Sequence, residues 1–452
     1  MAFGFGLLRI PLIGKFSIQH SKFLPVQYSL IFAVHQSCSM DLYTIITLLI
    51  VLSALFGYAN TRFLKLPDTI GLMVISLIFT LGILAAGVFI PALPEMARGF
   101  ITQIDFNEVL LDVMLSFLLF AGALHTDFNK LKEVRWPILL FATVGVLIST
   151  FLIGGMSFAL FQLLGLDVPF IYCLLFGSLI SPTDPIAVLS LLKQANVPKK
   201  LESKIVGESL FNDGIGVVVF ITIFHIAQVN EPHINWGEIG FLFLEEVAGG
   251  IGLGLLLGYL AWYFMRTVDN FAVEIMLSLA VVMGGTSLAV YFHFSGPLAM
   301  VVAGLFIGTD RFRTTSMSET TELYIDKFWE VLDILLNALL FVLIGLEIII
   351  LTLNGQFILA GILSIPICLA ARFIAISIPI RWLSKRLEFV PNTALVMTWG
   401  GLRGGISIAL ALSLEHFMAR DLLITVTYVV VLFSIIGQGL TISPLVKKLE
   451  KG

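Results

Sequence analysis

The chain has 452 residues, of which 58% are hydrophobic and only 12% are charged; its formal net charge is −4 and its mean hydropathy is +1.02. A soluble protein carries about twice that share of charged residues, so the composition excludes an ordinary soluble domain and predicts an all-α polytopic membrane protein. The sequence contains no P-loop, no zinc signature and no basic nucleic-acid tract, which argues against an ATP-driven pump and against nucleotide or nucleic-acid partners.

Residues 1–39 differ from the rest of the chain. They are mixed in composition, and their one apolar stretch, at 23–34, is too short to span a bilayer comfortably. Met40 stands directly before the first clean membrane segment. We interpret residues 1–39 as an N-terminal lead that is disordered or interfacial, or that precedes a biological start at Met40.

A transmembrane region is predicted for residues 40–446, followed by a short cytoplasmic tail, 447–452. Apolar runs of this length cross a bilayer as helices and contact membrane lipid. The sequence predicts thirteen such segments, at 42–60, 69–90, 109–125, 136–163, 168–192, 203–227, 239–265, 272–292, 296–309, 329–352, 357–380, 392–414 and 421–446.

Basic residues are distributed unevenly among the predicted loops. One alternating set of loops and loop-flanking positions carries 19 Lys and Arg residues, and the opposite set carries 2, Arg98 and Arg420. Because cytoplasmic loops gather Lys and Arg, the first segment is expected to start outside the cell and the C-terminus to lie in the cytoplasm. Two further arginines, Arg372 and Arg403, fall inside predicted membrane segments.

The first informative motif is a break in the segment 168–192. Asp184 lies between Pro182 and Pro185, and two prolines interrupt a helix and free main-chain carbonyl groups. A carboxylate at membrane depth is costly and indicates a functional site, and transporters build cation sites from broken helices. The alternative is a proline kink in which Asp184 only caps the broken turn.

The next segment, 203–227, carries further polar groups. Residues four apart share a helix face, so Ser209 is expected beside Asp213, and Asn212 beside Glu208. A buried Asp213 can bind either a proton or a dehydrated monovalent cation.

The predicted ligands are all oxygen atoms. They come from the carboxylates of Asp184 and Asp213, the hydroxyl group of Ser209, and the hydroxyl or main-chain carbonyl group of Thr183. Hard oxygen ligands suit Na⁺ or Li⁺, although oxygen alone does not separate these ions from K⁺.

A second interrupted helix is predicted in the segment 392–414. Four glycines surround Arg403 there, and this break lies in the second half of the chain as the first lies in the first half. Two such breaks are typical of an inverted repeat with the binding site between them. Glu208 needs a buried partner, which is either Arg372 or Arg403.

Taken together, these motifs resemble the sodium/proton antiporters of the cation–proton antiporter family 1, the sodium/hydrogen exchanger family. The resemblance covers residues 42–446 and is carried by Thr183-Asp184-Pro185, by the stretches 207–213, 337–345 and 401–405, and by Arg372. It implies about thirteen helices in an inverted repeat, in which the unwound helices 168–192 and 392–414 cross. It also implies a core domain (136–227 and 357–446) and a dimerisation domain (42–125 and 239–352).

The resemblance further implies a homodimeric secondary antiporter of a cell inner membrane that serves pH homeostasis and has no enzyme activity and no cofactor. It would exchange Na⁺ or Li⁺ for H⁺ one for one by an elevator motion. Asp213 would be the ion- and proton-binding carboxylate, with Asn212 as its partner and Asp184, Ser209 and Thr183 completing the site. Glu208 would form a structural ion pair with Arg372 or Arg403.

The third segment departs from the family pattern. Many relatives place an acid where this chain has Ala121, and the nearest acids, Asp112 and Asp127, lie toward the segment ends. This departure leaves cation choice and pH response open. Asp333 and Glu347 flank the stretch 337–345 and are weaker candidates for the ion path than Asp184 and Asp213.

Two other functions remain under consideration at this point. A K⁺/H⁺ antiporter could use the same scaffold and ligands. An ion sensor or channel without transport is a different class, but the sequence shows neither a repeated filter motif nor a large soluble output domain. A membrane-embedded protease is excluded by the lack of a metal motif or of a histidine beside Ser181 or Ser209.

Overall fold

The computed structural model describes residues 42–104, 109–184, 199–228, 236–351, 354–387 and 389–449. The predicted lead, residues 1–39, lies outside the described part. The described residues fold into helices and turns, without a strand, as the composition predicts.

Every predicted membrane segment contains a helix. Nine helices of the described part are long and apolar enough to cross a bilayer by length and composition, and three shorter ones are also apolar. The helices of the predicted segments are α2 (Leu42–Ala59), α3 (Asp68–Ala86), α6 (Leu115–Leu124), α8 (Arg135–Leu140), α9 (Val146–Leu163), α10 (Phe170–Ile180), α12 (Lys199–Gln228), α13 (Trp236–Met265), α14 (Phe271–Tyr291), α15 (Gly296–Ile307), α17 (Glu319–Glu347), α18 (Gly355–Leu383), α19 (Thr393–Trp399), α20 (Gly405–Leu412), α21 (Arg420–Leu432) and α22 (Gly439–Leu449).

Two features differ from the prediction. Helix α17 begins at Glu319, before the predicted apolar run at 329, because Ser318 caps it by accepting a hydrogen bond from the main-chain nitrogen of Thr321. Three short helices were not predicted, because they lie in polar loops without an apolar stripe long enough to detect; they are α4 (Ala92–Ile101), α7 (Phe128–Glu133) and α16 (Asp310–Ser316).

One group of helices packs around Trp329 of α17. The Trp329 ring lies 4.6 Å from the ring of Phe120 on α6, and its indole nitrogen donates to Ser278 of α14 at 3.0 Å. The buried cluster around these residues extends over α13 and α15. Helix α17 is also joined to α3, because the hydroxyl of Thr80 donates to the carbonyl oxygen of Gly345 at 2.9 Å.

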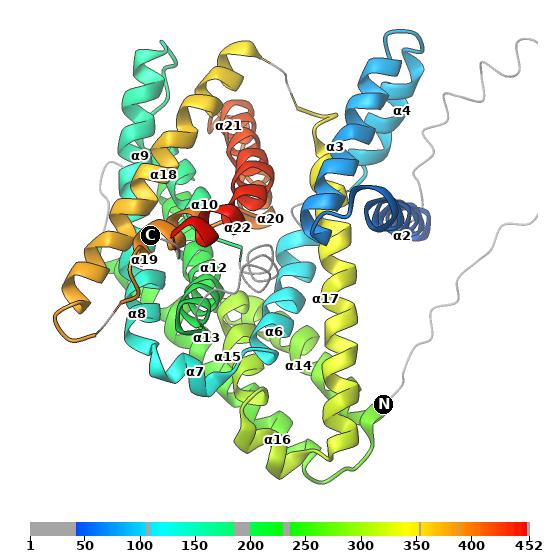
Figure 1. Cartoon of the computed structure of the whole chain (residues 1–452), viewed down its shortest axis with the longest axis vertical. Coiled ribbons are helices and arrows are strands. Elements are labelled where there is room, and N and C mark those ends of the chain that lie inside the picture. The colour runs from blue at the N-terminus through cyan, green and yellow to red at the C-terminus, as the bar shows by residue number, and fades with distance from the viewer. Residues whose placement is uncertain are drawn as a thin grey trace, which may run out of the picture. The chain divides into compact units, whose positions relative to one another are not determined.

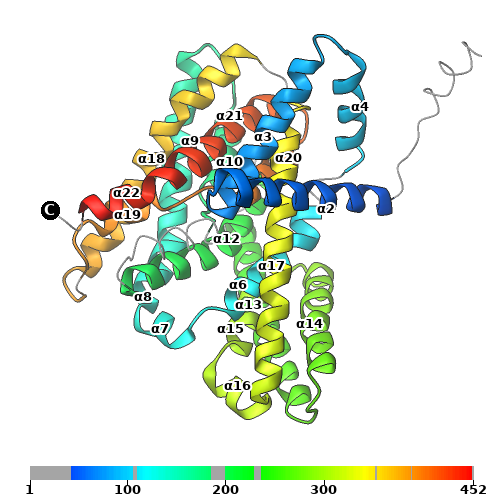
Figure 2. The same cartoon turned by 45° about the vertical axis from the view of Figure 1, so that its right-hand side comes forward.

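A second group contains α9, α10, α12, α18, α20 and α21. Helices α9 and α10 approach so closely that a Cβ atom on Gly177 would lie 2.2 Å from the carbonyl oxygen of Thr150. Small residues permit such backbone contact between membrane helices. In Figures 1 and 2, α9 and α18 lie on one side of the helices and α2, α3 and α4 on the other.

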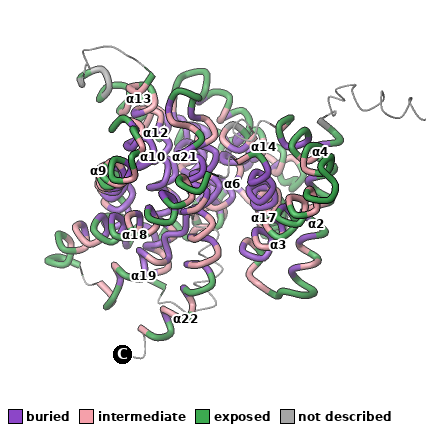
Figure 3. Tube along the Cα trace, turned by 90° about the horizontal axis from the view of Figure 1, so that it is seen from above, coloured by how far each residue is buried: buried purple, intermediate pink, exposed green. Residues whose placement is uncertain are grey.

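The two groups meet where α12 contacts α13 and α15, and where α17 contacts α20. Seen from above, buried residues line α10, α12, α17 and α21 in the interior, whereas exposed residues lie along the outer helices (Figure 3). Many of the exposed residues are large and apolar, as expected for side chains that face lipid. The polar residues of the predicted site therefore lie at the centre of an apolar bundle.

Candidate ion-binding site

Two interrupted helices meet at the centre of the bundle. Helix α10 ends at Ile180, and α19 and α20 are separated by the unwound residues 400–404. The main-chain nitrogen of Asp184 donates to the carbonyl oxygen of Leu402 at 2.8 Å, so the two unwound stretches contact each other directly. Both predicted breaks are present; the part of the segment 168–192 after Asp184 lies outside the described residues.

The glycine at 404 is required by this contact. A Cβ atom there would lie 2.4 Å from Oδ2 of Asp184 and 2.8 Å from its Cβ, distances at which atoms clash. The main chain at Gly404 is extended, with φ −116° and ψ −160°, so the need for glycine is spatial and not conformational. The glycine cluster thus brings the main chain of one break against the carboxylate of the other.

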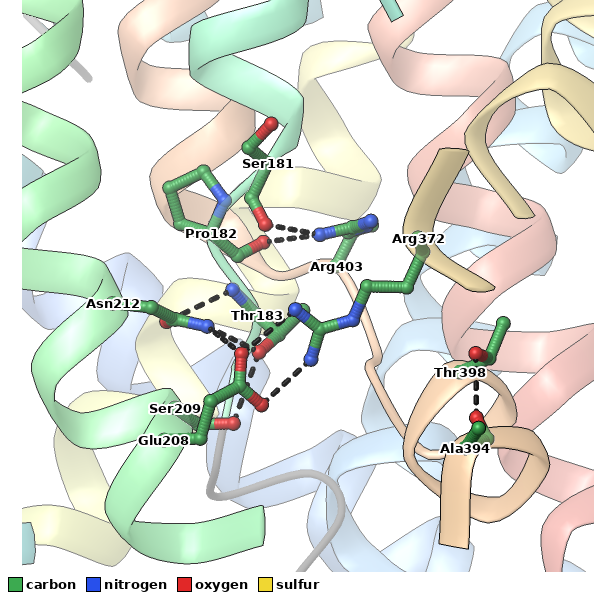
Figure 4. A network of polar contacts seen from close by, with 10 residues as sticks. All are labelled: Ser181, Pro182, Thr183, Glu208, Ser209, Asn212, Arg372, Ala394, Thr398 and Arg403. Carbon is green, nitrogen blue, oxygen red and sulfur yellow. Dashed lines mark hydrogen bonds and ion pairs between the residues drawn. The ribbon is translucent and has the colours of Figure 1, made fainter. Parts of the chain in front are cut away.

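Arg403 donates hydrogen bonds to main-chain carbonyl groups that follow the end of α10. Its Nη1 atom donates to the carbonyl oxygens of Ser181 and Pro182, the latter at 2.9 Å (Figure 4). Its main-chain nitrogen donates to the hydroxyl of Ser434 at 2.9 Å. The side chain is 4% exposed. A guanidinium group at the C-terminal end of α10 satisfies carbonyl groups there and opposes the negative end of the helix dipole.

Glu208 is paired with Arg372, which answers the question that the sequence left open. The Nη1 and Nη2 atoms of Arg372 lie 2.7 and 2.6 Å from Oε1 and Oε2 of Glu208, and the two residues are 2% and 0% exposed. A bidentate arrangement of this kind satisfies both charges where water is absent. Arg403, the other predicted partner, binds carbonyl groups instead.

Asn212, on α12, is hydrogen-bonded to two other residues of the site. Its Nδ2 atom donates to Oε1 of Glu208 and to the hydroxyl of Thr183, both at 2.8 Å, and its Oδ1 atom accepts from the main-chain nitrogen of Thr183 at 3.3 Å. Thr183 and Ser209 are also hydrogen-bonded to each other, with 3.0 Å between their hydroxyl oxygens. Asn212 therefore holds Thr183 and Glu208, whereas the expected direct pairing with Asp213 is not among its contacts.

Asp184 and Asp213 line a common cavity of about 40 Å³. Asp213 is 2% exposed, and the charges of Asp184, Glu208 and Arg403 act on it. A cavity of this size can hold an ordered water molecule or a dehydrated small cation. Of the predicted ligands, the two carboxylates border this cavity, whereas Thr183 and Ser209 belong to the hydrogen-bonded layer beside it. The cavity is further lined by residues of four helices, Leu115, Leu118, Leu119 and Gly122 of α6, Leu210 of α12, Asn337 and Leu340 of α17, and Gly405, Ile406 and Ser407 of α20.

The wall formed by α6 is apolar, as the departure from the family pattern predicts. Ala121 is 1% exposed within the cluster around Trp329. Asp127 accepts hydrogen bonds from the main-chain nitrogens of Asn129 and Lys130 and forms an ion pair with Lys130 at 2.7 Å, so it caps α7. That ion pair lowers the pKa of Asp127. The side chain of Asp112 lies outside the described residues.

Sequence reasoning missed the roles of two residues. Asn337 lines the cavity. A polar residue in an apolar run indicates a functional position, but the stretch 337–345 was interpreted only as a family motif. Ser434 lies in a π-helical turn, Phe433–Gln438, within the last membrane segment. Nothing in the sequence points to that turn, although such turns are frequent at functional sites.

Two interrupted helices that cross beside buried carboxylates, inside a bundle of apolar helices, define an ion-coupled membrane transporter. The profile described as "Sodium/hydrogen exchanger, transmembrane" matches residues 50–448 of this chain. The chain belongs to the sodium/hydrogen exchanger family. It is accordingly a member of a transporter family and not of an enzyme family.

Several curated proteins and solved structures are similar over nearly the whole length. The Na⁺/H⁺ antiporter NhaP of Pseudomonas aeruginosa is 48% identical over 411 residues, which cover 89% of this chain and 96% of the relative. The Na⁺/H⁺ antiporter NhaH of Halobacillus dabanensis is 37% identical over 415 residues, 90% of this chain and 98% of the relative. The structure of the sodium proton antiporter MjNhaP1 from Methanocaldococcus jannaschii has a TM-score of 0.70 at 22% identity, covers 91% of this chain and 99% of that one, and shows the same fold.

Proposed function

We propose that this protein is a secondary active antiporter that exchanges Na⁺, or Li⁺, for H⁺ across a prokaryotic plasma membrane. The observation that carries the proposal is the pair of carboxylates, Asp184 and Asp213, that borders one cavity where the unwound stretches meet. The two relatives described above are named Na⁺/H⁺ antiporters, so the K⁺/H⁺ alternative is not favoured. The transported ions are the substrates, and the exchange requires no cofactor.

Asp213 is the exchanging group in this proposal. Its carboxylate binds either one proton or one sodium ion, because both need the same negative oxygen atoms. Asp184 supplies a second carboxylate, and the hydroxyl groups of Thr183 and Ser209, which are hydrogen-bonded to each other beside the cavity, complete the oxygen ligands of the loaded site in this proposal. Transport of the two ions is coupled because Asp213 cannot bind a sodium ion and a proton at the same time.

The charge balance favours exchange of one ion for one proton. The charge of Glu208 is matched by Arg372 at 2.6 Å, and the amide of Asn212 is neutral. The loaded site then carries the same charge with a proton as with a sodium ion. We infer from the family resemblance that the site moves between the two sides in a core domain, within a homodimer, and that the C-terminus faces the cytoplasm.

The test is an exchange assay in proteoliposomes with an acidic lumen and a pH-sensitive dye. Adding Na⁺ or Li⁺ is expected to dissipate the pH difference in the wild type, and Asp213→Asn is expected to abolish the response. Asp127→Asn is the matched control, because Asp127 is an acid that pairs with Lys130 away from the cavity. A response to K⁺ alone would promote the K⁺/H⁺ alternative. Full exchange by a folded Asp213→Asn variant would move the site elsewhere.

A further inference from the structure

Asn337 is a polar residue in the cavity wall that the site, as described so far, does not use. The side chain is 5% exposed and borders the same cavity as Asp184 and Asp213. Its Nδ2 atom donates to the main-chain oxygen of Asp333 at 2.8 Å and to Oδ1 of Asp333 at 3.0 Å. Its Oδ1 atom is buried and has no hydrogen-bond partner among the described residues.

The contacts with Asp333 fix which way the amide faces. A main-chain carbonyl oxygen can only accept a hydrogen bond, so the end of the amide that faces it must be the NH₂ group. Turning the amide over would bring two oxygen atoms together at the carbonyl and again at the carboxylate. The oxygen of Asn337 is therefore held away from Asp333, at the cavity that the residue lines.

An acceptor in this position is expected to have a ligand. A buried carbonyl oxygen without a partner is destabilising, and folded proteins retain such groups mainly where water or an ion completes them. Neutral amide oxygens, together with carboxylates, are hard ligands of the kind that alkali cations accept in proteins. The two carboxylates of the same cavity supply the negative charge that draws a cation there.

We propose, on the basis of the antiport function proposed above, that Asn337 is a cation-coordinating residue. Its Oδ1 atom contributes a neutral ligand from α17 to the cation that Asp213 and Asp184 hold. The residues that α6 contributes to the same cavity are Leu115, Leu118, Leu119 and Gly122, which carry no side-chain oxygen. A neutral oxygen there supports cation binding without adding a charge to the one-for-one exchange.

The location of α17 adds a consequence for the ligand set. Helix α17 is joined to α3 by the hydrogen bond between Thr80 and Gly345 and packs on α6 through Trp329, whereas Asp213 lies on α12. The ligands therefore come from both helix groups. If the groups move relative to each other, Asn337 contacts the cation only in the arrangement described here and so contributes to affinity on one side of the cycle.

The experiment compares Asn337→Leu with Leu343→Met. Leucine has the branched shape of asparagine and lacks the oxygen, and Leu343 is buried on the same helix but is not among the residues that line the cavity. Two quantities are measured: the apparent KM for Na⁺ and Li⁺ in proteoliposomes at fixed pH, and the rise in unfolding temperature that Na⁺ causes in the purified protein. Asn337→Leu should raise the KM on the order of tenfold and reduce the rise in unfolding temperature. Leu343→Met should leave both near the wild-type values.

The proposal is overturned if Asn337→Leu keeps the wild-type KM and the wild-type Na⁺ stabilisation, or if Leu343→Met loses as much as Asn337→Leu, which would indicate a general effect of altered packing on α17. If the leucine variant does not fold, Asn337→Ser replaces it in the experiment, because the serine hydroxyl oxygen ends short of the cavity. An unchanged KM and an unchanged Na⁺ stabilisation in that variant would again overturn the proposal. A wild type that exchanges no cation contradicts the proposed function instead. In that case the Na⁺-dependent unfolding temperatures still decide whether Asn337 binds the ion.

Discussion

The amide of Asn212 lies between Glu208 and Thr183 and donates a hydrogen bond to each. Neighbouring residues on a helix point in directions about 100° apart, which explains how Asn212 can face this layer while Asp213 faces the cavity. The family resemblance implies one-for-one exchange. The NH₂ group of Asn212 is held by two neighbours that accept hydrogen bonds from it, Glu208 and Thr183.

We predict that Asn212→Asp stays electroneutral. The new carboxyl oxygen would replace a donor that lies 2.8 Å from Oε1 of Glu208. Two ionised carboxylates cannot share that distance, so the new group keeps its proton and adds no transported charge. The measurement is current across proteoliposomes in a sodium gradient, together with the ratio of sodium to proton flux. A sodium-driven current that exceeds the wild-type value would contradict this account.

The ion pair of Glu208 leads to a prediction about stability. Glu208→Ala leaves the guanidinium of Arg372 buried without its partner, which in comparable cases costs about 3–5 kcal/mol. The unfolding temperature should fall clearly below that of the wild type. The control is Glu330→Ala, because Glu330 forms a solvent-exposed pair with Lys327 that water screens, so its loss should change the unfolding temperature little. Equal unfolding temperatures for the two variants would refute the structural role of Glu208.

At the scale of elements, side-chain and main-chain hydrogen bonds hold the two unwound stretches together. Arg403 joins the end of α10 to the stretch between α19 and α20, and the hydrogen bond from Asp184 to Leu402 joins them again. Ser434, in the π-helical turn that follows α21, holds the main chain of Arg403. The end of α10, the stretch between α19 and α20, and the π-helical turn after α21 therefore fix the place where the unwound stretches meet.

We predict that Arg403→Lys impairs exchange by at least about tenfold while the protein remains folded. A lysine ammonium group is a point charge on a flexible stem, and it ends one bond short of the Nη1 atom with which Arg403 donates to the carbonyl oxygens of Ser181 and Pro182. The matched control is Arg420→Lys, because Arg420 also donates to a carbonyl oxygen, that of Leu412, but outside the cavity. Exchange rates and unfolding temperatures of the two variants are compared with the wild type. Normal exchange by Arg403→Lys would refute the need for the guanidinium group.

Several elements could be predicted from the sequence for a simple reason. Charged residues and prolines in apolar runs have few acceptable environments, so Asp184 and Asp213 indicated a site and the two breaks indicated interrupted helices. The partner of Glu208 could not be predicted, because Arg372 and Arg403 satisfy the same requirement and lie far from it in the sequence. The start of α17 was missed because its polar first turns carry no membrane signal, and the amide orientation of Asn337 depends on contacts that no pattern encodes.

At the scale of the whole molecule, the family and the all-helical membrane fold are established by sequence and structure comparison. The division into a core domain (136–227 and 357–446) and a dimerisation domain (42–125 and 239–352) stays a prediction, as do the homodimer and the cytoplasmic C-terminus. A cross-linking experiment between single cysteines placed on α2 of two protomers would test the dimer.

The competition between ions at one site predicts a specific pH dependence. Lowering the pH should raise the apparent KM for Na⁺, by up to about tenfold for each pH unit, because the proton occupies Asp213 in place of sodium. The maximal rate at saturating Na⁺ should change much less. Exchange rates at several Na⁺ concentrations and pH values test this. A maximal rate that falls with pH at constant KM would indicate a separate regulatory group instead of competition.

The one-for-one exchange proposed above also determines what energy source the protein can use. Each net charge that crosses a membrane exchanges about 2.3 kcal/mol with a potential of 100 mV, and a cycle that moves no net charge exchanges none. The sodium ratio across the membrane would then follow the proton ratio alone, about tenfold for one pH unit. A cell that lost its membrane potential would keep the sodium gradient that this protein sustains, whereas one that lost its pH difference would not.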